Sequence, residues 1–167
     1  MWGTAITVII AVVGIGYNSQ RHRRKSKPDI QQSMKQMSVL ALTTRFLAGD
    51  NRNILPASTN WCDALTKGYF EEWALKDPAD ISRGKCSYAY NTNVAGRSLI
   101  GMHPKTVFFF ETKSGWNQHG GPEILLEQPR YSNTYLVSCF DCSVLRVTKD
   151  QIPTLRWVPT YEAKKEE

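Results

Sequence analysis

The pattern of apolar and polar residues divides the first third of the chain into two parts. Residues 1–20 carry no charged side chain and contain the apolar run 5–16. From residue 29 the pattern becomes amphipathic, with apolar residues close to helical spacing at Ile30, Met34, Met37, Ala41 and Leu47. Asp29 is a predicted N-cap, and residues 49–51 predict the end of the helix. The pattern therefore predicts one long N-terminal helix with an apolar half and an amphipathic half.

After residue 60 the spacing of apolar residues changes from that of helices to that of strands. Residues 60–70 predict a short second helix, and strands are predicted at residues 87–91, 106–112, 135–139, 143–147 and 155–158. Residues 107–110 are apolar without a break, which is typical of a strand buried on both faces. Helices followed by strands predict an α+β fold, in which the amphipathic half of the first helix packs on a small antiparallel β-sheet.

Positive charge is concentrated next to the apolar segment. The formal net charge is +6, and residues 21–35 contain six basic residues and one acidic residue. Residues 36–167 contain fifteen basic and fourteen acidic residues, so this part of the chain is close to neutral. Because nucleic-acid binding requires a basic face on the folded domain, we expect no nucleic-acid partner. An anionic lipid surface is a better match for the basic residues 21–27.

These patterns divide the chain into four predicted parts. Residues 1–20 are a membrane anchor helix, and residues 21–28 are a basic juxtamembrane segment. Residues 29–159 form the α+β head, which includes the amphipathic half of the first helix. Residues 160–167 are a polar tail.

The anchor is predicted to be a single-pass transmembrane helix that contacts the lipid bilayer. Trp2 and Tyr17 lie where interfacial aromatic residues are expected. A signal peptide and a buried helix are the alternatives for this segment, but a signal peptide carries its positive charge before the apolar run. Here the charge follows the run, and the positive-inside rule then points to a head in the cytoplasm.

The four cysteines leave two questions open. A disulfide between Cys62 and Cys86 would indicate an oxidising compartment, whereas two buried free thiols are equally ordinary. Cys139 and Cys142 have the CxxC spacing of redox or zinc sites. A redox motif should open a helix and a structural zinc site needs four ligands. The pair falls in a predicted hairpin, which favours thiols that occupy a strand and a turn.

The glycine-rich loop 115–123 has two interpretations. Trp116 and Asn117 are able to contact a ligand that approaches the backbone at the glycines, with Glu123 at the end of the loop. The alternative is that Trp116 fills the core and Asn117 fastens the turn, and we favour this structural interpretation. The loop lacks the Lys-Ser/Thr ending of a phosphate-binding loop.

Glu111 is the one carboxyl group at the end of the strongest predicted strand. If buried, it needs a partner, and Arg130 or Arg156 is able to supply one. No nucleophile with an adjacent base and no metalloprotease motif is visible in the sequence. We therefore predict neither enzymatic activity nor a cofactor.

Several stretches occur together in a fixed order and carry a resemblance to a known family: residues 35–42, 48–51, 55–56, 61–65, 87–91, 110–112, 115–117, 120–123 and 155–157. Tyr131, Asp141 and Cys142 lie between the stretches 120–123 and 155–157, and nine residues separate Tyr131 from Asp141. In this order residues 35–159 resemble the pseudopilin-like proteins of type II secretion and type IV pilus systems. The likeness is closest to the planctomycete and verrucomicrobial variety with a His-x9-Asp-Gly motif. Tyr131 replaces the His and Cys142 replaces the Gly, and residues 1–20 lack the leader and the glutamate of a type IV pilin start.

The resemblance implies a pilin-like fold and a function. It implies a non-enzymatic, membrane-anchored structural protein, a minor component of a type II secretion or type IV pilus-like machine, with other pilin-like subunits as partners. It also implies that the head lies outside the cytoplasm, contrary to the positive-inside rule. A non-polymerising, membrane-tethered binding or sensor module is the second hypothesis. A redox or metal protein that uses Cys139 and Cys142 is the third.

Overall fold

Helix α2 (Ile30–Asp50) is the longest element of the computed structural model, which describes residues 29–161. Asp29 is extended, with φ −83° and ψ 122°, and its side chain accepts a hydrogen bond from the Gln31 amide at 3.0 Å. This is the N-cap that the sequence predicts. The described helix therefore begins after Asp29, and the predicted apolar half of the first helix lies outside the described residues.

The elements after α2 are short. They are the helix α3 (Trp61–Thr66), the strands β1 (Cys86–Asn91), β2 (Val107–Gly115), β3 (His119–Gly120), β4 (Tyr135–Cys139) and β5 (Val144–Val147), and the 3-10 helices η1 (Glu72–Leu75), η2 (Thr92–Val94), η3 (Pro122–Ile124) and η4 (Ile152–Thr154). The predicted mixture of helices and strands is confirmed. Residues 155–158, by contrast, form no strand, and Arg156 makes a single bridge with Thr106.

The five strands form one sheet in the order β3-β1-β2-β4-β5. β1, β2, β4 and β5 pair antiparallel, whereas β3 pairs parallel with β1. The prediction of a purely antiparallel sheet is therefore wrong at β3. The path of the chain explains the parallel pairing of β3. After β2 the chain reverses and passes to the outer edge of β1. A strand that runs opposite to β2 and lies beside β1 must be parallel to β1.

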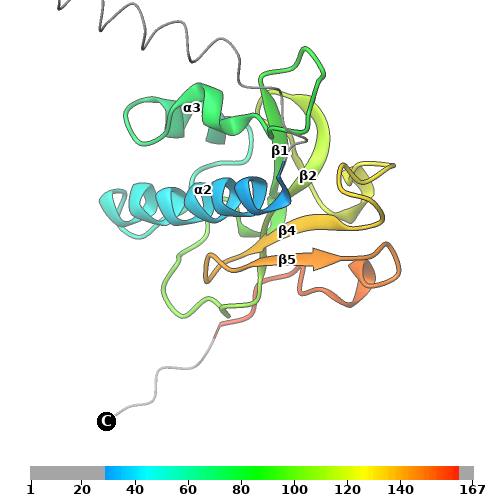
Figure 1. Ribbon diagram of the computed structural model, residues 1–167. Helices are drawn as coiled ribbons and strands as arrows, with labels where there is room; N and C mark the ends of the chain where they lie inside the picture. The colour runs from blue at the N-terminus through cyan, green and yellow to red at the C-terminus, as the bar shows by residue number, and fades with distance from the viewer. Residues whose placement is uncertain (1–28, 162–167) are drawn as a thin grey trace, which may run out of the picture.

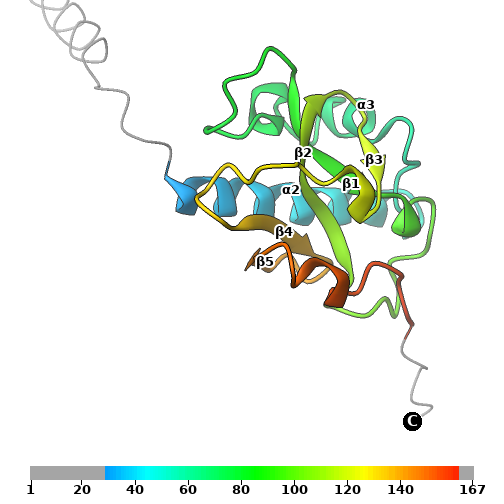
Figure 2. The same ribbon diagram turned by 90° about the vertical axis from the view of Figure 1, so that its right-hand side faces the viewer.

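Helix α2 lies across one face of the sheet, and α3 lies beside it (Figures 1 and 2). The main core fills the space between these helices and the sheet. It is rich in aromatic residues: the Trp61 ring of α3 lies 5.1 Å from the ring of Phe109 and 6.0 Å from that of Tyr90, measured between centroids. From α2, Met37 and Leu40 join this core with no exposed surface. Non-directional burial of this kind is the main contribution to folding.

Strand β2 is buried on both faces, as its sequence predicts. Phe108 and Phe109 belong to the main core, and Phe110 belongs to a second cluster on the opposite face, where it packs against Trp157. Two consecutive phenylalanines reach the same core because the pairing of β2 with β4 shifts register between Val107 and Phe109. A bulge of this kind changes the face to which the following side chains point.

Within residues 29–161, no helix combines the length and apolar character needed to cross a bilayer. The predicted anchor, residues 1–20, and the basic segment, residues 21–28, lie outside the described residues, as does most of the predicted polar tail.

Candidate functional site

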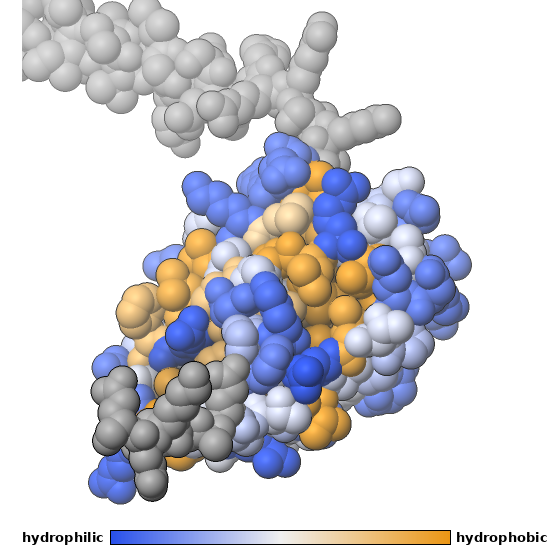
Figure 3. Space-filling view, turned by 90° about the horizontal axis from the view of Figure 1, so that it is seen from below, coloured by the Kyte–Doolittle hydropathy of each residue, from blue (hydrophilic) through white to orange (hydrophobic). Residues whose placement is uncertain are grey.

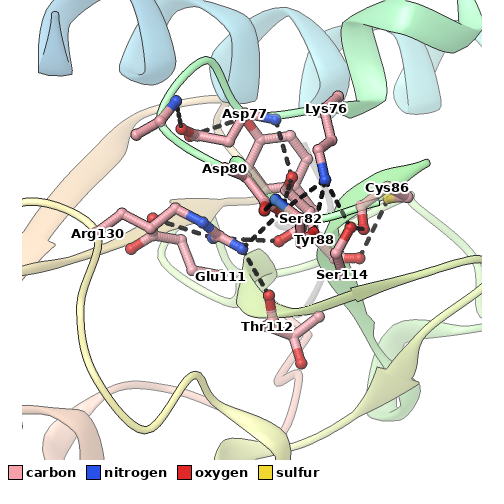
Figure 4. A network of polar contacts seen from close by, with 12 residues as sticks. Lys76, Asp77, Asp80, Ser82, Cys86, Tyr88, Glu111, Thr112, Ser114 and Arg130 are labelled. Atoms are coloured by element: carbon pink, nitrogen blue, oxygen red, sulfur yellow. Dashed lines mark hydrogen bonds and ion pairs between the residues drawn. The ribbon is translucent and has the colours of Figure 1, made fainter. Parts of the chain in front are cut away.

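Charged side chains are buried where the loop before β1, strand β2 and the loop before β4 meet (Figure 4). We call this group the buried ion cluster; it consists of Lys76, Asp77, Asp80, Glu111 and Arg130. Desolvation of an ion costs several kcal/mol unless the ion is paired and hydrogen-bonded. The cluster must therefore satisfy its own charges.

Arg130 is the centre of the cluster. Its guanidinium donates to Glu111 Oε1 at 3.3 Å and to Asp80 Oδ2 at 3.1 Å. It also donates to the Thr112 carbonyl at 2.8 Å, and only 8% of its side chain is exposed. Of the two partners that the sequence offers for Glu111, the structure uses Arg130, because Arg156 is exposed at the surface.

Glu111 is fully buried, and its ionisation is accordingly disfavoured. Burial raises the pKa of Glu111 to about 7, even though the Leu136 amide and Arg130 favour the charged form. The negative charge of Asp77 adds to the increase. The Leu136 amide of β4 donates to Glu111 Oε2 at 2.8 Å, so the carboxyl group also joins β2 to β4.

The pKa of Asp80, in the same cluster, is shifted in the opposite direction to that of Glu111. Burial alone would raise its pKa, but hydrogen bonds from Ser87, Ser82 and Lys76 outweigh this effect and hold the pKa of Asp80 well below its usual range. The Ser87 hydroxyl donates to Asp80 at 2.6 Å, and Lys76 Nζ lies 3.1 Å from the same carboxylate. Asp80 is therefore the ionised partner of the two cations.

The cluster is connected to helix α2 through Tyr131. The Tyr131 hydroxyl donates to Asp77 Oδ1 at 3.1 Å and lies 2.5 Å from the Ser33 hydroxyl. One turn further along α2, the Gln36 amide donates to the Lys76 carbonyl at 2.7 Å. These bonds tie the first half of α2 to the loop that carries the acidic residues.

The three residues of the degenerate motif do not come together. Tyr131 belongs to the connection with α2, whereas Asp141 forms an ion pair with Lys105 at 2.6 Å. Cys142 has φ +65° in the turn between β4 and β5, a conformation that favours glycine. The Asp141-Cys142 pair therefore has the role of a turn.

The glycine-rich loop is fastened to α3. The Trp116 indole donates to Asp63 Oδ1 at 2.9 Å, and the Asn117 amide group donates to Asp63 Oδ2 at 2.6 Å. Asn117 Oδ1 accepts from the Cys62 amide at 2.8 Å, in the first turn of α3. Glu123 accepts from the Gly121 amide at 2.7 Å within the loop itself. These polar groups hold the loop in place, which supports its structural interpretation.

Cys139 and Cys142 lie in the hairpin between β4 and β5, where the sequence predicts them. The Cys142 amide donates to the Cys139 carbonyl at 2.9 Å. Burial raises the pKa of Cys139, which opposes formation of the reactive thiolate. In the part of the chain from residue 29 to residue 161, no three His, Cys, Asp or Glu side chains are grouped so as to hold a metal ion.

A row of apolar side chains on α2 points away from the sheet. We call it the helix stripe; it consists of Val39, Leu42 and Phe46, with 42%, 42% and 62% of their surface exposed. The spacing of three and four residues puts them on one side of the helix. The predicted apolar side of α2 faces the core and does not include these three residues. Their spacing of three and four residues is nevertheless visible in the sequence.

A groove runs beside the helix stripe. It has a volume of about 520 Å³ and lies between α2 and residues 69–74, with Val39 on one wall and Tyr69 and Trp73 on the other. Trp73 is 73% exposed. On the face seen from below, apolar residues gather in several areas, with hydrophilic residues between and around them (Figure 3). Large exposed apolar patches are typical of interaction surfaces.

Comparisons with known proteins identify no relative: no family of proteins, no curated protein and no solved structure matches this chain.

Replacement of Arg130 tests whether the cluster holds the head together. Arg130→Met removes the cation and leaves Glu111 and Asp80 buried without it, so we expect the free energy of unfolding at pH 8 to fall by about 3–5 kcal/mol. Arg146→Met is the matched control, because Arg146 is exposed on β5, and we expect a change within about 0.5 kcal/mol. Urea denaturation measures both. A loss below about 1 kcal/mol for Arg130→Met would contradict the structural role.

The raised pKa of Glu111 predicts a dependence of stability on pH. The folded chain keeps the Glu111 proton up to about pH 7, whereas the unfolded chain loses it near the ordinary value of 4.5. Between these values the folded state binds more protons, so the free energy of unfolding falls as pH rises, by roughly 3 kcal/mol from this group.

Glu111→Gln provides the control, since an amide oxygen still accepts from Leu136 but does not titrate. We expect the difference in unfolding free energy between the native protein and this variant to change steadily between pH 4.5 and pH 7.5. A difference that is independent of pH would show that Glu111 does not titrate in this range.

Proposed function

We propose that the chain is a membrane-anchored, pseudopilin-like assembly protein. In this proposal residues 1–20 anchor it in the bilayer, residues 21–27 contact anionic lipid, and the head binds other pilin-like subunits. The resemblance over residues 35–159 supports the proposal from the sequence. A long helix that packs on a small, mainly antiparallel sheet is compatible with it, and the head then lies outside the cytoplasm as the resemblance implies.

The helix stripe is the observation that carries the proposal. A helix that only covers a sheet needs apolar residues on one side, and α2 already buries Met37, Leu40 and Ala41 there. Val39 and Phe46 on the opposite side contribute nothing to this core. Because only the basic segment 21–28 and Asp29 separate the predicted anchor from α2 in the sequence, molecules anchored in one membrane would carry their stripes on the same side of it. This arrangement favours packing between the α2 helices of neighbouring subunits.

The binding-module hypothesis is favoured by a different observation, the groove between α2 and residues 69–74. It places the exposed Trp73 opposite Lys35 and Gln32, so that apolar and polar groups face the same space. A non-polymerising tethered module would use this groove for a partner and would remain a monomer in the membrane.

The anchor has a direct test. Val8→Arg combined with Val12→Arg places two charges in the apolar run, where each costs about 2.5–3.5 kcal/mol for insertion. We expect the double variant to move from the membrane fraction to the soluble fraction, as measured by sedimentation of cell lysates. The exposed Ile81→Arg with Val158→Arg is the control with equal added charge, and we expect it to stay with the membrane. Retention of the Val8/Val12 variant in the membrane would rule out the anchor.

Assembly is tested by a charge in the helix stripe. We expect Phe46→Lys to abolish oligomers of the full chain extracted in mild detergent, because a lysine at the centre of a helix contact has no partner there. Ile81→Lys is the matched control, since Ile81 is 99% exposed and lies outside α2. Native gel electrophoresis distinguishes the results. A native protein that is itself monomeric, or equal oligomers in both variants, would contradict the proposal.

A further inference from the structure

Two buried cysteines that the proposed function does not use belong to the same core cluster. Cys62 is in the first turn of α3, and Cys86 is the first residue of β1. Both have no exposed surface and belong to the same core cluster. Burial and the neighbouring Cys86 thiol raise the pKa of Cys62 far above its usual range. One turn contacts both residues: the Asn117 amide donates to Cys62 Sγ at 3.3 Å, and Gly115 pairs with Cys86 across the sheet. Their proximity is thus fixed by helix, strand and turn together.

The structure contains both residues as free thiols, the reduced state of the pair. We propose that Cys62 and Cys86 form a disulfide when the chain folds in an oxidising compartment. The bond would join α3 to β1 across the loop that carries Asp77 and Asp80 of the buried ion cluster. It would therefore restrain the loop on which the cluster depends. The inference is independent of the assembly role.

The reaction is thiol–disulfide exchange with a small-molecule or protein disulfide as the oxidant. The thiolate of one cysteine attacks a sulfur of the oxidant, which forms a mixed disulfide and releases one oxidant thiolate. The second cysteine, as a thiolate, then attacks the sulfur of the first and releases the other oxidant thiolate. The two cysteines lose two electrons and two protons, and the oxidant gains them as two thiols.

Burial determines when this reaction takes place. An oxidant has no access to either sulfur in the folded head, because both residues are covered completely. Burial also raises the pKa of Cys62 far above its usual range, so the folded head contains no thiolate there at neutral pH. The exchange therefore takes place in the unfolded or locally opened chain. Once the head has folded, the pair retains the redox state in which it folded.

The other two cysteines provide an internal comparison. Cys142 is partly exposed, and its Sγ lies 3.6 Å from the Arg45 guanidinium. A thiol-specific reagent applied to the folded protein should therefore modify Cys142 first and leave Cys62 and Cys86 unmodified.

The experiment uses the full chain in detergent, unfolded with reductant in guanidinium chloride. One portion is refolded with reduced and oxidised glutathione and another with reductant alone. After denaturation the remaining thiols are alkylated, and peptides are identified by mass spectrometry without reduction. We expect a Cys62–Cys86 crosslink in most molecules of the first portion and in none of the second. Alkylated Cys62 and Cys86 in the first portion, or crosslinks of either residue to Cys139 or Cys142, would overturn the proposal.

Two further measurements on the same samples need no substitution. We expect the crosslinked protein to melt roughly 5–15 °C above the reduced protein. We also expect oxidation of the folded, reduced protein by glutathione disulfide to be at least about tenfold slower than that of the unfolded chain, since it must await opening. Equal melting temperatures would show that the bond does not restrain the fold, and equal rates would contradict formation before burial.

Discussion

The contact between Arg130 and Glu111 is the constraint on which the arrangement of the head depends. Both side chains are buried, so the charge of Arg130 needs buried partners, and Glu111 together with the ionised Asp80 supplies them. Arg130 bonds Asp80 in the loop before β1, and Glu111 accepts from the Leu136 amide of β4. Tyr131, which bonds Asp77 of the cluster, also contacts Ser33 of α2. The loop that carries Asp77 and Asp80 is in this way joined to the sheet and to α2. The aromatic core supplies most of the free energy, and the cluster determines how the loops and α2 are placed on the sheet.

The sequence predicted those parts of the fold that depend on local patterns. The N-cap at Asp29 is such a feature, because capping needs only the residue and its neighbours. The sequence also offered Arg130 as one of two partners for Glu111 in the case that this carboxyl group is buried, and the structure shows that pair. Asp77 and Asp80 were not predicted, since they lie in a polar loop whose path is fixed by contacts distant in the sequence. Strand β3 has only two residues and leaves no periodic pattern.

Helix α2 was predicted with one apolar side and has two. The residues that face the sheet are in the core, and Leu42 and Phe46 on the other side are exposed. A helix of this kind is stable within the head and still has a surface for a neighbour, and our proposal of a pseudopilin-like assembly role depends on that surface. The cluster contributes to this role indirectly, because the bonds from Tyr131 to Ser33 and from Gln36 to the Lys76 carbonyl orient α2 and hence the direction of the stripe.

The coupling between Ser33 and Tyr131 tests most directly whether the buried ion cluster holds α2 in place. A double-mutant cycle with Ser33→Ala and Tyr131→Phe, followed by urea denaturation, isolates the interaction from other effects of each substitution. If the hydroxyls bond as the structure shows, the cycle should give a coupling energy of about 0.5–1.5 kcal/mol. Effects that add within about 0.3 kcal/mol would contradict the account, because the connection from the cluster through Tyr131 to α2 would then contribute nothing to stability.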